Sequence, residues 1–137
     1  HNMASLYIYT MIAGYFKYLL HAKGKYHLHS PLVYDFYEKV FSGQEERRPL
    51  TSFGHYNDNF YSELDRRIQK FVKDNPLVFN NDDTILIVKD NHSDKKNESD
   101  WHRLIATEKV RLSIDCWHFG IVFVMNRLKK ENYILRI

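Results

Sequence analysis

The sequence predicts a small mixed β-sheet packed by N-terminal helices, the layered arrangement of an α/β domain that is α+β in its chain order. Three observations lead to this fold class. An apolar run covers Thr84–Val88, two β-rich runs follow at Val110–Trp117 and Gly120–Met125, and apolar residues recur at helical spacing upstream. The last two runs are close enough in sequence to predict a C-terminal antiparallel hairpin.

The run Thr84–Val88 predicts a strand that is buried on both faces. Its five residues are all apolar or β-branched and show no alternation with polar residues. Turn-forming residues precede it at 80–83 and follow it at 90–94. A strand covered on both faces requires helices on both sides of its sheet.

The run Val110–Trp117 instead alternates in polarity. Its apolar side chains fall on one face, and Arg111, Ser113 and Asp115 fall on the other. Between this run and the next, residues 118–120 form a short connection with one glycine, as a tight hairpin needs. We therefore expect these two strands to pair directly.

Helical periodicity and turn residues predict the remaining elements. Helices are expected over Leu6–Ala22, Leu32–Phe41, Tyr61–Asp74 and Ser99–Thr107, and a final strand over Tyr133–Ile137. Ser30 is placed to cap the second helix and Pro31 to occupy its first position. The first helix is too short to span a bilayer, although a helix lying on a membrane surface is an open alternative.

These elements predict a single domain over residues 6–137. It comprises N-terminal helices over 6–41, a loop over 42–59, and a helix with the sheet core over 60–137. The loop is long for a compact domain, which suggests function or mobility. Residues 1–5 look like a tag remnant around a start codon and are excluded from the fold.

The composition is that of a globular protein with no strong charge preference for a partner. The 137 residues carry a net charge of +3, and the basic residues are spread along the chain. This balance does not by itself favour nucleic acid. The single cysteine, Cys116, cannot form an intramolecular disulfide, which favours a cytoplasmic location. The aromatic content of 15% mildly favours a partner surface, because aromatic side chains contribute much of the burial in interfaces.

Two pairs of residues are candidate site residues. His27 and His29 could bind a metal, but no cysteine or carboxylate with ligand spacing accompanies them, so structural roles are favoured. Asp90 and His92 follow the first strand and are the only pair that resembles a catalytic site. A capped loop explains Asp90 and His92 equally well.

Four blocks of the chain resemble one family, a group of bacterial class I S-adenosylmethionine-dependent methyltransferases. Residues 25–35 resemble its "H-x-x-H-S-P-F-V-Y-D" segment, and Asn80–His92 is similar to its "H-N-D-S-x-x-I-F-D-D-I-H". Residues 114–123 resemble its "I-D-x-F-x-x-G-I-V-F-F", and 132–137 resemble its C-terminus. The resemblance implies a partial Rossmann-like methyltransferase fold in which Thr84–Val88 is the family's fifth strand.

The part of the family that binds S-adenosylmethionine has no counterpart here. The resemblance implies four earlier strands and a glycine-rich strand-to-helix turn, in which glycines let the backbone approach the cofactor. This chain has a 42–59 loop in that place, with Gly43 and Gly54 far apart, and contains no G-x-G. We therefore predict no cofactor and identify no cofactor-binding residue. The family's acidic pair after the fifth strand is Lys89-Asp90 here, which weakens a catalytic or metal role.

These observations leave three functions open. The first is a degenerate methyltransferase relative without enzyme activity that serves as a structural or protein-interaction module. The second is a methyltransferase whose site is completed by dimerisation or by a partner chain. The third is a nucleic-acid binder that uses basic groups and aromatic stacking. Without its neighbours the Thr84–Val88 strand has an open edge, which predicts a homodimer, or cover by the N-terminal helix or by Tyr133–Ile137.

Overall fold

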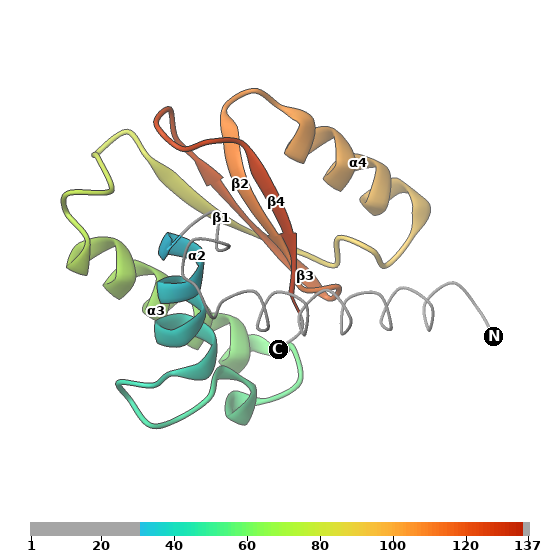
Figure 1. The fold of residues 1–137 in the computed structure, drawn as a ribbon. Helices are drawn as coiled ribbons and strands as arrows, with labels where there is room; N and C mark the ends of the chain where they lie inside the picture. Colours follow the sequence, from blue (N-terminus) through green and yellow to red (C-terminus); the bar gives the residue numbers. More distant parts are fainter. Residues whose placement is uncertain (1–30, 136–137) are drawn as a thin grey trace. The chain divides into compact units, whose positions relative to one another are not determined.

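The computed structural model describes residues 31–135, which combine helices with a four-stranded mixed sheet (Figure 1). Within this range, residues 31–80 and 81–135 form two compact units, and each is described by itself. The helix predicted over Leu6–Ala22, the Ser30 cap, the pair His27 and His29, and the end of the last predicted strand lie outside the described residues.

The sheet of residues 81–135 has the strand order β1-β3-β2-β4. The strands are β1 (Thr84–Lys89), β2 (Val110–Asp115), β3 (Phe119–Val124) and β4 (Glu131–Ile134). β3 pairs antiparallel with both β1 and β2, and β4 pairs parallel with β2. The predicted antiparallel hairpin is confirmed, and it follows that β1 and β2 run parallel on either side of β3.

A helix connects the two parallel strands. α4 (Lys95–Ala106) lies between β1 and β2 in the chain, which makes β1-α4-β2 a crossover connection of the kind that parallel strands require. The helix begins four residues before the predicted start at Ser99. Asp94 caps it, with its carboxylate accepting from the Asn97 amide at 2.7 Å, and this local polar signal lies outside the apolar periodicity used for the prediction.

Trp101 of α4 packs on the sheet at a position where no side chain projects from β3. Trp101, Val110 and Val122 form a buried cluster with Val88 and Leu104 packed against it. Gly120 lies under the indole, and a Cβ atom there would be 2.2 Å from the Trp101 ring. The hairpin turn thus does not use Gly120, which was the expected turn glycine, and Trp117 adopts the left-handed conformation instead, with φ of 72°.

Replacing Gly120 with Ala is expected to destabilise the protein by about 1–3 kcal/mol, because the added methyl group overpacks the indole. Urea unfolding would measure the loss. The cost should shrink in a Trp101→Phe background, where the atoms nearest the new methyl are gone. An equal cost in both backgrounds would show that contact with the indole is not its cause.

The expectation that Thr84–Val88 is buried on both faces is wrong. β1 alternates between exposed and half-buried residues, and Leu86 is 42% exposed. Burial on both faces belongs to β3, which has a neighbouring strand on each side, whereas β1 is at the edge of the described sheet. The final strand also does not cover β1, since β4 pairs at the opposite edge, beside β2.

Residues 31–80 form a helical unit whose core is aromatic. Its elements are α2 (Pro31–Phe36), η1 (Tyr37–Ser42), η2 (Leu50–Phe53) and α3 (Asp58–Asp74). Phe36 of α2 packs edge-to-face on Phe41 and on Phe71 of α3, with ring centroids 5.6 and 5.1 Å apart. The predicted helix over 32–41 is therefore present, but its second half is a π-helix that ends at Gly43, whose φ is 62°.

The segment predicted as a loop over Ser42–Asn59 contains more regular secondary structure than expected. It contains η2, and α3 begins at Asp58 rather than at Tyr61, because the Asn57 side chain accepts from the Phe60 amide at 2.9 Å. Arg67 lies among the charged residues of α3 but is 2% exposed. Its guanidinium donates to the carbonyl oxygens of Val40 in η1 at 2.9 Å and of Arg48 at 2.6 Å, so it links η1 to the residues that follow the turn after Gly43.

Within residues 31–135, no helix has both the length and the apolar character needed to cross a membrane.

Candidate functional site

The candidate site lies where the parallel strands β1 and β2 end. β1 finishes at Lys89 and leads into the turn of Asp90, Asn91 and His92, while β2 finishes at Asp115. In α/β sheets ligands bind outside the carboxyl ends of the strands, so this is the edge at which a functional group is expected. The hydrogen bond from the Asp90 amide to the His118 carbonyl, at 2.9 Å, joins the two turns.

His92 lies between two carboxylates. Its Nδ1 is 2.7 Å from Glu98 Oε2, and its Nε2 is 2.6 Å from Asp115 Oδ2. The imidazole side chain is 2% exposed, and the Asp115 carboxylate is 8% exposed. Both acceptors are carboxylate oxygens, so both ring nitrogens donate when the imidazole is protonated, and the arrangement favours the imidazolium.

The pKa of His92 reflects two opposed effects. Burial lowers it, but the hydrogen bonds to Asp115 and Glu98 and the charges of both carboxylates outweigh burial, so the pKa of His92 is raised above its ordinary value. Trp117 adds a stacked ring at a centroid distance of 4.6 Å and an interplanar angle of 9°. The imidazolium is thus enclosed by two anions and an aromatic face.

Asp115 is the centre of this cluster. Besides His92, it accepts from Asn91 Nδ2 at 3.1 Å and from the Trp117 amide at 3.0 Å, both through Oδ1. The second hydrogen bond stabilises Trp117 in its left-handed conformation. Asn91 is 1% exposed, and its Oδ1 is the one buried side-chain polar atom in residues 31–135 without a hydrogen-bond partner.

The structure places the predicted pair Asp90 and His92 in one turn but gives the two residues different partners. The Asp90 carbonyl accepts from Ser93 and from the Asn97 side chain, and the Asp90 amide donates to the His118 carbonyl. Asp90 has a φ of 57°, which an aspartate tolerates at a turn. His92 instead contacts Glu98 and Asp115, neither of which is a predicted site residue. The signal that could have found Asp115 is its place at the end of a strand parallel to β1.

The side chains of this cluster bond one another and do not offer His92 to a substrate. A base must offer a free lone pair to substrate, and both nitrogens of His92 are used in hydrogen bonds. In residues 31–135, no group of three or more His, Cys, Asp or Glu side chains is placed to hold a metal ion. Cys116, next to Asp115, is buried, and burial raises the pKa of its thiol well above the ordinary value, which disfavours the reactive thiolate.

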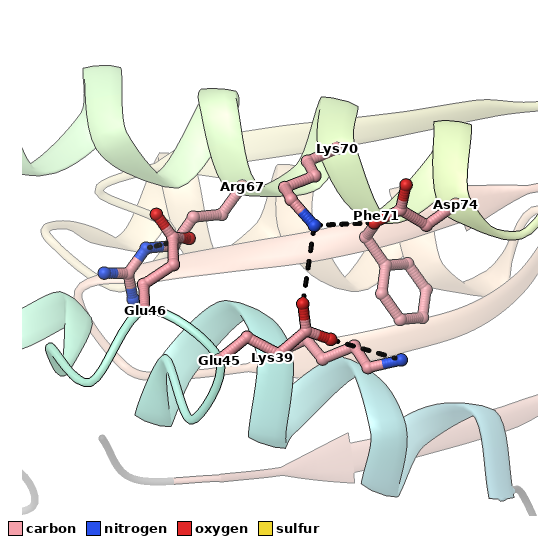
Figure 2. A pocket seen from close by; sticks show the side chains of 7 residues that line it. All are labelled: Lys39, Glu45, Glu46, Arg67, Lys70, Phe71 and Asp74. Atoms are coloured by element: carbon pink, nitrogen blue, oxygen red, sulfur yellow. Dashed lines mark hydrogen bonds and ion pairs between the residues drawn. The ribbon is translucent and has the colours of Figure 1, made fainter.

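A second polar cluster lies within residues 31–80, between η1 and α3 (Figure 2). Three cations face three carboxylates around a space of about 10 Å³, which holds one water molecule at most. The lining residues are Lys39, Glu45, Glu46, Arg67, Lys70, Phe71 and Asp74. Lys70 is 2.7 Å from Asp74 and 3.5 Å from Glu45, so the charges are paired with one another and leave no room for a ligand.

Comparisons of the chain with family models, with curated proteins and with solved structures found no match.

Proposed function

We propose that the chain is a non-catalytic relative of S-adenosylmethionine-dependent methyltransferases that acts as a structural or protein-interaction module. The observation that carries the proposal is the closed network around His92. The place where an α/β sheet binds its ligand is filled here by an imidazolium that is 2% exposed and bonded at both nitrogens.

Two further features support this proposal. The parallel pair of strands joined through α4 is the unit on which α/β folds are built, which agrees with the α/β part of the resemblance. The five glycines of the chain include no G-x-G, the spacing with which a strand-to-helix turn brings the backbone close to a nucleoside cofactor. A cofactor site of the usual kind does not fit these residues.

Calorimetric titration of the full chain with S-adenosylhomocysteine and with S-adenosylmethionine tests the proposal. We expect no binding heat up to millimolar ligand and no rise in melting temperature, because a ligand that binds only the folded state would raise it. A methyltransferase with an intact glycine-rich turn, titrated in the same buffer, is the positive control.

Micromolar binding would overturn the non-catalytic proposal. It would favour the alternative, a methyltransferase whose site is completed by a second copy or by a partner chain. A labelled methyl-transfer assay on cell extract would then decide whether that site is active, and Asp115 and Asn91 would be the first residues to vary.

A further inference from the structure

The outer edge of β1 offers backbone groups for pairing with another strand. The Asp90 amide donates to the His118 carbonyl, and these positions continue the register in which Val88 faces Gly120. In an antiparallel ladder, residues that bond the neighbouring strand alternate with residues that do not. Thr84, Leu86 and Val88 therefore bond β3, whereas the backbone groups of Ile85 and Ile87 point to the other side.

The pairing of β3 with β2 agrees with this alternation. The Cys116 amide donates to the Phe119 carbonyl at 2.9 Å, so Phe119 bonds toward β2 and Gly120 toward β1. Within residues 31–135 no strand pairs with β1 on its outer side. Leu86 adds an apolar side chain, 42% exposed, on the same strand. An exposed apolar edge of this kind favours pairing with another strand.

We propose that β1 pairs antiparallel with β1 of a second copy of the chain, with the two-fold axis passing at Leu86. The proposal rests on the proposed function, because it names the partner of the interaction module. It joins two four-stranded sheets into one continuous sheet of two copies.

The register follows from the alternation and from the side chains. Residues whose backbone groups point to the outer edge must lie opposite each other, which restricts the two-fold axis to a few positions along β1. An axis at Leu86 places Ile85 opposite Ile87 of the other copy. Leu86 then lies opposite Leu86 of the other copy in a non-hydrogen-bonded pair, where facing side chains approach most closely and bury each other.

The charged ends of the strand favour the same axis. With the axis at Leu86, Lys89 lies opposite Asp83 of the other copy, an acidic residue that pairs with Arg127 of its own chain at 2.5 Å. Moving the axis to Ile85 places Lys89 opposite Asn81, and moving it to Ile87 places Lys89 opposite Ile85. Opposite charges in facing positions stabilise a strand pair, so the axis at Leu86 is the favoured one.

Disulfide trapping of variants that carry one added cysteine tests the register. In the proposed dimer the Cα atoms of the two residues 86 are about 4.5 Å apart, within the range of a disulfide. We expect Leu86→Cys to yield a cross-linked dimer on mild oxidation. The unmodified protein, whose Cys116 is buried, is the blank.

Thr84→Cys is the matched control, because Thr84 is exposed and lies on the same face of β1. In the proposed register Thr84 lies opposite Val88 of the other copy. The two residues 84 are therefore separated by four residues, roughly 13 Å along the strand. No cross-link should form there. Equal cross-linking at both positions, or none at position 86, would overturn the proposed register.

A proline at position 87 tests the pairing itself. The Ile87 amide points away from β3, so Ile87→Pro removes no bond of the β1–β3 ladder but blocks strand addition at the outer edge. Light scattering should show loss of the dimer, with an unchanged circular dichroism spectrum. Val88→Pro, which does remove a ladder bond, should lower stability as well. A dimer that survives Ile87→Pro contradicts the proposal.

These outcomes are separable from the cofactor titration. Ligand binding with the cross-linking pattern intact would overturn the non-catalytic proposal alone. Absence of both ligand binding and cross-linking would overturn the β1 dimer alone.

Discussion

Replacing Arg67 with Met should lower the free energy of unfolding by about 3–5 kcal/mol, the cost of removing one partner from a buried charged network. Methionine keeps much of the volume of arginine but donates no hydrogen bond. The carbonyl oxygens of Val40 and Arg48 would lose their donors, and Glu63 would lose the Nε contact of 2.8 Å. Urea unfolding followed by circular dichroism measures the loss.

Arg66→Ala is the matched control for this prediction. Arg66 is the preceding residue of α3 and also contacts Glu63 and Glu46, but its side chain is 48% exposed. An exposed ion pair contributes up to about 1 kcal/mol, so the control should lose far less stability than Arg67→Met. Similar losses in the two variants would show that burial of the Arg67 guanidinium does not set its contribution.

Replacing His92 with Gln should lower stability by roughly 3 kcal/mol at acidic to neutral pH, because it leaves the buried Asp115 carboxylate without its cation. The contact with Glu98 counts for less, since the Glu98 side chain is 45% exposed. Asp115 keeps the donors from Asn91 and Trp117, which places the effect at the lower end of the range for buried pairs.

The free energy of unfolding that His92→Gln loses relative to wild type should decrease as the pH rises. The folded pKa of His92 is raised, so its stabilising contribution is complete below the unfolded value of about 6.5 and is lost as pH rises through the folded pKa. The unfolding free energies of wild type and His92→Gln therefore approach each other as the pH rises. Burial lowers the pKa of His118, so the contribution of His118 to stability rises with pH. Both proteins contain His118, so this contribution cancels when their unfolding free energies are subtracted.

His102→Gln is the control for the histidine prediction. His102 lies on the exposed face of α4, so its replacement should change stability little at any pH. Unfolding free energies measured across the pH range below and above the ordinary histidine pKa provide the comparison. A difference for His92→Gln that widens toward high pH would contradict an imidazolium held between two carboxylates.

The elements of the fold were largely predictable from local patterns. The hairpin of β2 and β3 followed from two β-rich runs close in sequence, and α3 followed from apolar residues at helical spacing. Helix starts were missed at Asp58 and Lys95 because they are set by the capping side chains of Asn57 and Asp94, which apolar periodicity does not include.

The candidate site was predictable only in part. The sequence pointed to the turn after β1 and to His92, but it paired His92 with Asp90, the nearer acidic residue in the chain. The actual partners, Glu98 and Asp115, are six and 23 residues away. Their approach depends on the strand order, which brings the ends of β1 and β2 to one edge, and on the first turn of α4.

The sequence by itself determined the class of fold, the hairpin and the lack of a glycine-rich turn, because these depend on residue type and short-range spacing. Only the tertiary structure decided which charged residues are buried and which strand lies at the edge. Arg67 is on the polar stripe of α3 yet is enclosed by the segment after η1. In the sheet described for residues 31–135, the apolar β1 lies at the edge while β3 is central. Burial and pairing depend on contacts between residues distant in the chain, which local pattern does not encode.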